Sequence, residues 1–400
     1  MVLPSRLAVG IGSFHSARGA WQLALALLAI SGDTVLAGVS SGDRVVSDLR
    51  PLVAQLVSRG APGAMLVLSE NGVQQVVSLG RSSRKVETPI APTDVWRIAS
   101  VTKMVTAVVA SQLVSEGKLA LDTPISRYLP HILPLAERIT IQHLLNHTSG
   151  IPDYLSDPRS PIQKSAKRLI ADLVAPRSFD ATVGIARRLP RQSEPGDLHE
   201  YSNTNYVLLG RIIEEVERTS FAESVRKRVL RPLRLKRTGF ASRSGRIPDS
   251  SIRTYLPSGE RRRPSAFKER LYDVTRHTYF LGGDGGLYSN GVDLVRLLDG
   301  IWQGPLLNAP SRDALTSDLV EEHDGQYRYG LGVMAFPTSC GRTVYGHEGR
   351  DLGSYTLALT DRARMRHLVL VMNRSIDGLA GADKTLTAIR NIAFCDASQL

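Results

Sequence analysis

The chain has 400 residues, which is enough for two or three domains, and a two-part architecture is the expected arrangement. Hydrophobic residues make up 42% of the chain and charged residues 22%, a composition that excludes collagen-like, coiled-coil and wholly disordered proteins. No apolar run reaches the ~20 residues that span a bilayer, which excludes a multi-span membrane protein.

The net charge of +12 comes from 50 Lys and Arg against 38 Asp and Glu. Such an excess favours an anionic partner, which could be nucleic acid, a membrane or a wall polymer. Aromatic residues are only 6% of the chain, and neither zinc-ligand spacing nor an RNA-binding signature is present. We therefore expect no nucleic-acid partner and interpret the basic runs as solvated surface.

The first 37 residues have the layout of a secretory signal peptide. Arg6 and Arg18 precede a short apolar stretch at residues 20–30, and small residues up to Ala37 suit a signal peptidase. We expect a secreted, extracellular protein that begins near residue 38. The alternatives are an uncleaved anchor, which would leave the protein associated with the cell envelope, and a translation start further downstream.

Cys340 and Cys395 are the two cysteines of the chain. Two cysteines cannot build a zinc site of the Cys-x-x-Cys kind with four thiolates. In an exported protein such a pair most often forms one disulfide, whereas two separate buried thiols would be normal in the cytosol.

The N-terminal part of the mature chain predicts a helix followed by a hairpin and a second helix. Apolar residues recur at helical spacing over 45–56, and the helix ends near Gly60. Two apolar runs, 64–68 and 73–79, flank Asn71-Gly72, the strongest short signal for a β-hairpin. Residues 100–116 form an amphipathic pattern that Gly117 ends.

The middle of the chain predicts helices, and the C-terminal third predicts strands. Helices are expected at 139–146 and 206–216, with a helical and loop-rich stretch between 153 and 200. Strands are expected at 329–335, 342–345, 354–359 and 367–372, before a helix at 379–394. We expect an α+β fold in which an antiparallel sheet from both chain ends (38–120 and 275–396) is flanked by helices and interrupted by a mostly helical insert (121–274).

Ser100 and Lys103 are the first candidate catalytic pair. Positions i and i+3 of a helix share a face, so the lysine can act as a base or a positive charge beside the hydroxyl. At the first turn of a helix, free N–H groups favour a developing oxyanion. The same spacing occurs at Ser82/Lys85, Ser115/Lys118, Ser224/Lys227 and Ser265/Lys268. Only Ser100 follows an apolar lead-in and opens an amphipathic helix.

Two further motifs carry groups suited to acid–base chemistry and substrate binding. In Tyr201-Ser-Asn203, a tyrosine near an ammonium group can have a lowered pKa, and the asparagine can accept from a lysine and donate to a carbonyl. In His347-Glu-Gly349, the glycine would let a substrate backbone approach closely. Tyr288-Ser-Asn290 and His323-Asp-Gly325 are rival copies, and a helix-entry turn or a structural histidine is the alternative interpretation.

Together, these three motifs resemble the serine β-lactamase and penicillin-binding superfamily. Their order is similar to the class C β-lactamases and the secreted D-Ala-D-Ala carboxypeptidases. The resemblance covers residues 45–396. It extends to the segments 96–103 (WRIASVTK), 112–122 (QLVSEGKLALD), 143–150 (HLLNHTSG), 201–206 (YSNTNY), 329–332 (YGLG) and 344–347 (VYGH).

The resemblance implies a role for each site residue. Ser100 is the acylated nucleophile, Lys103 and Tyr201 share proton transfer, and Asn203 orients Lys103 and the substrate amide. The substrate-binding strand carries His347 and Gly349, and the oxyanion hole consists of the backbone N–H groups of Ser100 and Arg350. Cys340 and Cys395 match the disulfide pair of the secreted carboxypeptidases. The order of proton transfer between Lys103 and Tyr201 stays open.

Glu348 departs from the family pattern, because relatives that cut terminal D-Ala carry Thr or Ser there. An acidic side chain at this position should repel a substrate carboxylate. The expected function is a secreted D-Ala-D-Ala carboxypeptidase or transpeptidase that penicillins acylate. The alternatives are an esterase or class C-like β-lactamase, and a non-catalytic penicillin-binding sensor. We expect a monomer that needs neither metal nor organic cofactor.

Overall fold

The computed structural model describes residues 41–159, 178–242, 244–248, 251–258, 270–277 and 282–396. The predicted signal peptide and the rival pair Ser265/Lys268 lie outside these ranges. None of the described helices combines the length and apolar character needed to cross a bilayer.

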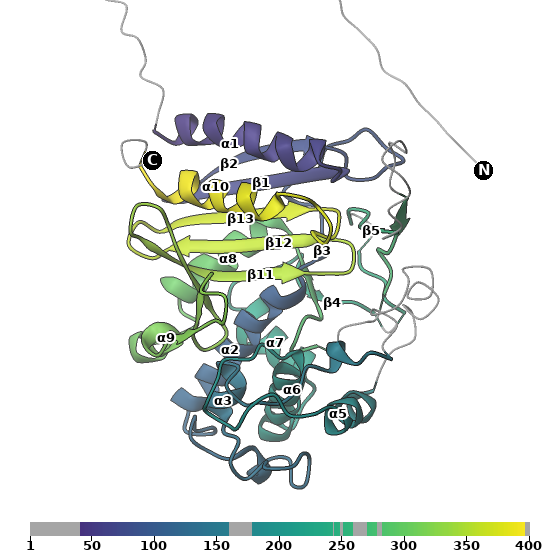
Figure 1. Cartoon of the computed structure of the whole chain (residues 1–400). Helices are drawn as coiled ribbons and strands as arrows, with labels where there is room; N and C mark the ends of the chain where they lie inside the picture. The colour runs from purple at the N-terminus through teal and green to yellow at the C-terminus, as the bar shows by residue number, and fades with distance from the viewer. Residues whose placement is uncertain are drawn as a thin grey trace, which may run out of the picture. The chain divides into compact units, whose positions relative to one another are not determined.

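An eight-stranded antiparallel sheet is the centre of the structure (Figure 1), and strands from both ends of the chain meet in it. The strand order is β2-β1-β13-β12-β11-β10-β9-β8. The N-terminal hairpin is β1 (Gly63–Glu70) and β2 (Val73–Gly80), and β1 pairs with β13 (Arg366–Met372). The remaining strands are β8 (Val320–Glu321), β9 (Arg328–Tyr329), β10 (Met334–Pro337), β11 (Thr343–Arg350) and β12 (Tyr355–Asp361). This arrangement confirms the expected α+β fold.

The hairpin turn between β1 and β2 forms as its sequence predicts. Asn71 and Gly72 both have positive φ, at 50° and 80°. A two-residue turn of this kind matches the twist of the strands, and asparagine and glycine adopt it at little cost.

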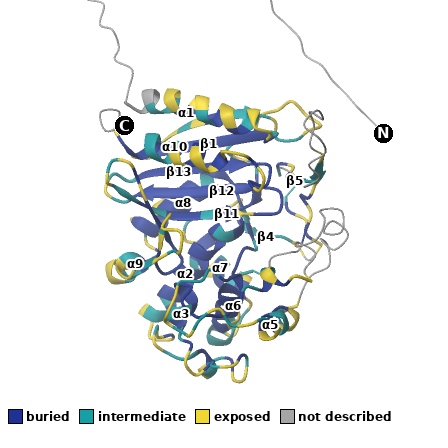
Figure 2. Ribbon diagram, viewed as in Figure 1, coloured by how far each residue is buried: buried dark blue, intermediate teal, exposed yellow. Residues whose placement is uncertain are grey.

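Helices cover both faces of the sheet, and the central strands β1, β12 and β13 are buried between them (Figure 2). On one face lie α1 (Ser41–Ser58) and α10 (Ala382–Phe394), which pack on Leu66, Leu357 and Leu370. The other face packs against α8 (Gly291–Trp302) and α2 (Thr102–Ser115), and it presents Val67 and Ala358. Alternation along each strand therefore separates two apolar cores.

The helix after Ser100 differs from the expected amphipathic element. Ser100 lies in a single 3₁₀ turn, η1 (Ala99–Val101), and α2 begins only at Thr102. Residues 102–111 are all buried, because α2 is contacted from several sides by β11 and by three helices, α6 (Asn203–Glu217), α7 (Phe221–Val225) and α9 (Ala309–Ser317). The expected apolar stripe is thus one side of a helix that is enclosed almost completely.

The segment between the two halves of the sheet is only partly helical. Its described helices are η2 (Ile125–Arg127), α3 (Ile141–Leu145), η3 (Tyr154–Ser156), α5 (Phe179–Arg188), α6 (Asn203–Glu217), α7 (Phe221–Val225) and η5 (Arg226–Leu230). It also contains short strands, which the sequence interpretation missed. β4 (Gly239–Phe240) joins β3 (Trp96–Arg97) and β7 (Leu287–Ser289) in one small sheet, and β5 (Tyr255–Pro257) pairs with β6 (Leu271–Asp273).

The strand expected at 329–335 is interrupted. β9 ends at Tyr329 and β10 begins at Met334, with Gly332 in a positive-φ conformation (73°) between them. A Cβ on Gly332 would lie 2.4 Å from the Cβ of Ala107 and 3.0 Å from the Lys103 carbonyl oxygen. The chain therefore bends at this glycine to pass close to α2. Just before the bend, the Leu331 amide donates to the Leu315 carbonyl of α9 (Ala309–Ser317).

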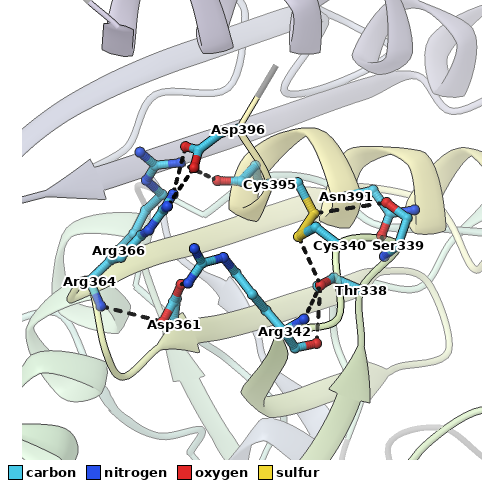
Figure 3. The surroundings of a disulfide bond; sticks show 11 residues. Thr338, Ser339, Cys340, Arg342, Asp361, Arg364, Arg366, Asn391, Cys395 and Asp396 are labelled. Carbon is cyan, nitrogen blue, oxygen red and sulfur yellow. Dashed lines mark hydrogen bonds and ion pairs between the residues drawn. A yellow bond between two sulfur atoms is a disulfide. The ribbon is translucent and has the colours of Figure 1, made fainter. Parts of the chain in front are cut away.

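Cys340 and Cys395 form the expected disulfide, with an S–S distance of 2.01 Å (Figure 3). The bond joins the β10–β11 turn to the residue that ends α10. Beside it, the Ser339 amide donates to Asn391 Oδ1 at 3.1 Å. The disulfide thus closes a loop that contains β11, β12, β13 and α10.

Candidate active site

Ser100 and Lys103 meet as their spacing predicts. Lys103 Nζ donates to Ser100 Oγ at 2.9 Å. The preceding residue, Ala99, has a φ of 44°, a left-handed conformation that is costly for a residue with a Cβ. This bend allows the chain to leave β3 and enter the 3₁₀ turn with Ser100 still partly exposed, whereas Lys103 is fully buried.

Lys103 is held by three acceptors. Besides Ser100, it donates to Asn203 Oδ1 at 2.8 Å and to the Asp284 backbone carbonyl at 2.7 Å. Burial lowers the pKa of Lys103 to about 8, and the carboxylates of Asp284 and Asp153 limit the fall. Because a neutral amine is then accessible near neutral pH, Lys103 can accept the proton of Ser100.

Tyr201 also lies beside the nucleophile, since the Ser100 side chain is close enough to its phenol to affect the pKa of Tyr201. Its ring centroid lies 5.0 Å from Lys103 Nζ. The expected lowering of its pKa is wrong, because burial raises the pKa of Tyr201 well above its ordinary value and outweighs the lowering effect of the Ser100 side chain. The two pKa shifts therefore favour Lys103 over Tyr201 as the proton acceptor and keep the Tyr201 phenol neutral.

Asn203 connects Lys103 to an acidic residue that the sequence interpretation missed. While Asn203 Oδ1 accepts from Lys103, its Nδ2 donates to Asp153 Oδ2 at 2.9 Å. Asp153 also accepts from the Leu155 amide at 3.1 Å and so begins the turn η3. The amide of Asn203 is therefore oriented from both sides, with its oxygen on the lysine.

Asp284 is the second missed residue. Its side chain accepts from the Tyr154 hydroxyl at 2.7 Å while its carbonyl accepts from Lys103. The only signal for it in the sequence is its place within the glycine run 282–286. A Cβ on Gly283 would lie 2.4 Å from the Tyr206 carbonyl oxygen of α6, so this run packs directly on the helix that carries Asn203.

A group of rings supports Tyr201 from behind. His147 lies at its centre, 4.2 Å from Tyr201 and 4.8 Å from Tyr329, measured between ring centroids. The Ser202 amide donates to His147 Nδ1 at 3.2 Å. Burial holds the pKa of His147 well below its ordinary value, so this ring is neutral. The segment 143–150 was noted in the sequence for its family likeness, but no role was assigned to His147.

His347 lies on β11 and is buried. Its Nε2 hydrogen-bonds the Tyr329 hydroxyl at 2.9 Å, and its Nδ1 contacts the Glu348 carbonyl oxygen. Burial, reinforced by the charge of Lys103, lowers the pKa of His347 to about 3. The residue is therefore a neutral part of the site wall and offers no positive charge to a substrate.

Gly349 permits a close contact within the protein, and its expected role in substrate approach stays a prediction. A Cβ at this position would lie 2.1 Å from the carbonyl oxygen of Ile98, two residues before the nucleophile. The glycine therefore lets β11 pack directly against the turn that carries Ser100. The close approach that it permits is between two parts of the protein, where the sequence suggested approach by a substrate.

Glu348 lies on the other face of the sheet from His347 and Gly349. It is paired with Leu357, which belongs to the core under α1 and α10. Its carboxylate accepts from the Tyr355 hydroxyl and from Arg350 Nε, each at 2.9 Å. The predicted repulsion of a substrate carboxylate is therefore not supported, because this carboxylate points away from Ser100.

Replacing Glu348 with glutamine should leave catalysis almost unchanged. Because the side chain lies behind the sheet, we expect kcat/KM for a neutral ester to change by no more than about twofold. The measurement is steady-state hydrolysis of a p-nitrophenyl ester by the wild type and the variant. A large gain in cleavage of a carboxylate-terminated peptide would instead show that Glu348 reaches the substrate.

The second half of β11 has a free edge beside the nucleophile. β10 pairs only with residues 343–346 of β11, whereas β12 pairs along its whole second half. The Asp351 amide donates to the Ser354 carbonyl at 2.9 Å, toward the β12 side. Since successive N–H groups of a strand point in opposite directions, the Arg350 N–H points to the free edge. Its backbone thus fits the expected oxyanion hole.

The rival motifs have structural roles or lie away from the site. Asn290 caps α8 by accepting from the Asp293 amide at 2.7 Å, so Tyr288-Ser-Asn290 is a helix-entry turn. Lys118 pairs with Glu116 at the end of α2, and Ser224 is buried in α7. Within the described ranges, no cluster of three or more His, Cys, Asp or Glu side chains is arranged to hold a metal ion.

A serine hydroxyl between a buried lysine and a tyrosine phenol, on a turn under the edge of an antiparallel sheet, defines a serine hydrolase of the Ser–Lys class. Comparison with known families agrees with this class. The family model described as Beta-lactamase matches residues 49–391, and the chain belongs to this β-lactamase and penicillin-binding family.

Relatives in this family carry several activities in their names. The chain is 26% identical to Esterase EstB of Burkholderia gladioli, over 82% of this chain and 89% of the relative. It is also 26% identical to a putative D-alanyl-D-alanine carboxypeptidase of Escherichia coli, over 80% of each chain. Among solved structures, a D-stereospecific amidohydrolase from Streptomyces superposes with a TM-score of 0.77, at 27% identity, over 87% of this chain and 98% of that one.

Proposed function

We propose that the protein hydrolyses small ester or amide substrates through an acyl-enzyme on Ser100, and that the leaving part of the substrate carries no carboxylate. The observation that carries this proposal is the charge of the site. Lys103 donates to three protein acceptors, and His347 is neutral. Arg350 is paired with Glu348 behind the sheet. Lys103, His347 and Arg350 therefore offer no free positive charge to a substrate carboxylate.

The proposed reaction uses each group at a stated step. Ser100 Oγ attacks the substrate carbonyl while neutral Lys103 accepts its proton. The N–H groups of Ser100 and Arg350 stabilise the oxyanion. The proton then passes through the Tyr201 phenol to the leaving alcohol or amine, and the acyl group remains on Ser100. A water molecule attacks the acyl-enzyme with the same groups in reverse, which releases the acid.

A second candidate is the D-Ala-D-Ala carboxypeptidase expected from the sequence. The free edge of β11 favours it, because a peptide backbone can add there as an extra strand. The non-catalytic sensor is supported less well, because the complete set of Ser100, Lys103, Tyr201 and Asn203 is assembled. A sensor that only binds needs no such proton relay.

The first experiment is intact-mass analysis and peptide mapping after exposure to a fluorescent penicillin. We expect one adduct, on Ser100, in the wild type and in Ser82→Ala, and none in Ser100→Ala. Ser82→Ala is the matched control because it removes the serine of a rival Ser-x-x-Lys pair. An adduct on another residue, or none in the wild type, would contradict the proposed nucleophile.

The substrate class is tested with matched pairs of compounds. We expect hydrolysis of a p-nitrophenyl ester and of a D-amino acid amide, and faster cleavage of a C-terminally amidated D-Ala-D-Ala peptide than of its free acid. Faster cleavage of the free acid would support the carboxypeptidase instead. For each of these substrates, Ser100→Ala provides the background rate of hydrolysis.

We also propose that the protein is exported as a monomer. The disulfide Cys340–Cys395 supports an oxidising compartment, and the signal-like segment 1–37 supports cleavage near residue 38. N-terminal sequencing of protein recovered outside the cytoplasm, together with light scattering, tests both statements. An intact N-terminus in the cytoplasm, or a stable oligomer, would contradict them.

A further inference from the structure

A buried polar cluster joins the two segments that carry the proposed oxyanion hole. It consists of Arg97, His277, Asp351 and Ser354, whose exposed fractions are 6%, 1%, 5% and 1%. Arg97 lies three residues before Ser100, and Asp351 is the residue after Arg350. The cluster therefore flanks both N–H donors in sequence, although the two donors are 250 positions apart.

The first connection between the two segments runs through His277. Arg97 Nη2 donates to the His277 carbonyl at 2.6 Å, and also to the Gly245 carbonyl at 2.7 Å. The ring of His277 reaches Asp351, with Nε2 3.1 Å from Asp351 Oδ2. His277 therefore contacts Arg97, before Ser100, through its backbone carbonyl. It contacts Asp351, just after β11, through its ring.

The second connection runs through Ser354. Its hydroxyl donates to the Arg97 carbonyl at 3.3 Å, and its own carbonyl accepts from the Asp351 amide at 2.9 Å. Between the two connections, Gly349 packs against Ile98, as described above. The segments 97–98 and 349–351 are therefore joined directly at Gly349 and Ile98, and indirectly through His277 and through Ser354.

The cluster contains two buried polar atoms that reduce its contribution to stability. Arg97 Nε and Asp351 Oδ1 are buried and have no hydrogen-bond partner among the described residues. Buried polar atoms without partners are unfavourable and concentrate at functional sites. Burial alone would raise the pKa of Asp351, but His277 and Arg97 outweigh it and hold this carboxyl in its charged form.

We propose that Arg97, His277, Asp351 and Ser354 are positioning residues that set the separation of the Ser100 and Arg350 N–H groups, and so tune stabilisation of the oxyanion. The proposal rests on the acyl-enzyme function proposed above. Oxyanion donors act only at about 2.7–3.1 Å from the position of the oxyanion, so a small shift between the two segments weakens the transition state more than the ground state.

The test compares Asp351→Asn and Ser354→Ala with the wild type. Asp351→Asn removes the charge at constant size, and Ser354→Ala removes the contact to the Arg97 carbonyl. We expect Asp351→Asn to lower kcat for a p-nitrophenyl ester by roughly 10–100-fold and to weaken inhibition by phenylboronic acid, which mimics the tetrahedral state, by a similar factor. KM should change by less than about threefold. Ser354→Ala should also lower kcat and weaken inhibition by phenylboronic acid, but by smaller factors.

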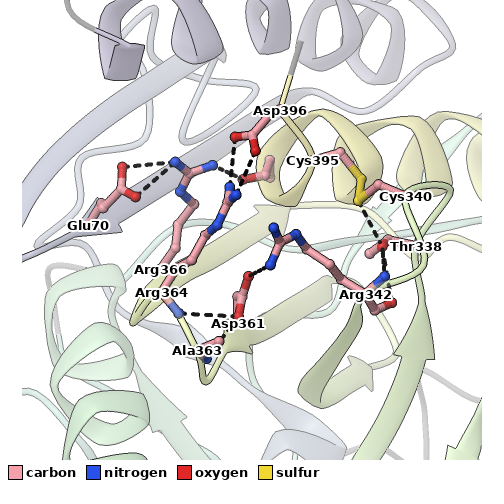
Figure 4. Close-up of polar contacts among 11 residues, drawn as sticks. Glu70, Thr338, Cys340, Arg342, Asp361, Ala363, Arg364, Arg366, Cys395 and Asp396 are labelled. Carbon is pink, nitrogen blue, oxygen red and sulfur yellow. Dashed lines mark hydrogen bonds and ion pairs between the residues drawn. A yellow bond between two sulfur atoms is a disulfide. The ribbon is translucent and has the colours of Figure 1, made fainter. Parts of the chain in front are cut away.

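Glu70→Gln is the matched control. Glu70 pairs with the buried Arg366 at 2.8 Å, joining β1 to β13 in the same sheet (Figure 4). The Glu70→Gln substitution should lower the melting temperature without changing kcat or the affinity for phenylboronic acid. Asp351→Glu keeps the charge and should recover part of the lost kcat.

The outcomes separate this proposal from the proposed function. If the wild type forms no adduct on Ser100 and hydrolyses no ester, the proposed function fails. If the wild type is active but Asp351→Asn and Ser354→Ala keep its kcat and boronate affinity, the positioning role fails alone. It also fails if kcat falls in proportion to melting temperature in Asp351→Asn, Ser354→Ala and the control Glu70→Gln alike, since that result describes general destabilisation.

Discussion

Replacing Lys103 with methionine is expected to reduce the rate of Ser100 acylation by roughly 10²–10⁴-fold, the usual contribution of a general base. Methionine keeps much of the length of the side chain but cannot accept a proton. The loss should appear in kcat/KM for an ester and in the rate of penicillin labelling, because both report acylation. Lys118→Met is the matched control, since Lys118 belongs to a rival Ser-x-x-Lys pair and is paired with Glu116.

The pH dependence of the acylation rate provides a second test of Lys103 as the general base. With the pKa of Lys103 at about 8, the neutral amine is scarce at pH 6 and dominant at pH 10. Acylation should therefore rise with pH through about 8 and then level off. The rise should be absent in Lys103→Met and present in Lys118→Met. A wild-type profile that is flat from pH 6 to 10 would show that another group accepts the proton.

Removing the disulfide is expected to have the largest effect on stability. Cys340 and Cys395 are 55 residues apart, and the chain-entropy relation for a loop of that length gives about 4 kcal/mol of the free energy of unfolding. The double variant Cys340→Ser/Cys395→Ser should lose this amount in urea titrations. Activity at room temperature should stay within about twofold, because the bond lies at the end of β11 remote from His347.

Asn391→Ala is the control for the disulfide experiment. It removes the hydrogen bond from the Ser339 amide beside the bond but leaves the loop closed. We expect a loss of about 1 kcal/mol in this variant. If the double cysteine variant loses no more free energy of unfolding than Asn391→Ala does, the disulfide does not stabilise the protein by constraining the unfolded chain.

Features that depend on neighbouring residues could be predicted from the sequence. The Asn71-Gly72 turn follows from the ease with which these two residues adopt positive φ. The contact between Ser100 and Lys103 follows from the geometry of one helical turn. The antiparallel strands of the C-terminal third follow from their apolar alternation. In each case, the feature depends on residues that are only a few positions apart. The local sequence is therefore sufficient to predict it.

Features that depend on burial by distant segments could not be predicted in the same way. Tyr201 was expected to have a lowered pKa because its motif suggested a nearby ammonium, but complete burial raises the pKa instead. Glu348 was expected to face the substrate, but strand register places it behind the sheet. Asp153 and Asp284 carry no motif of their own.

The sequence by itself therefore determined the candidate nucleophile and its nearest candidate base, because residue type and short spacing specify such a pair. Only the tertiary structure decided their charge states and the direction in which each points. Desolvation and strand register depend on contacts between residues that are distant in the sequence, such as the contact of Gly349 with Ile98. No local sequence pattern predicts such contacts.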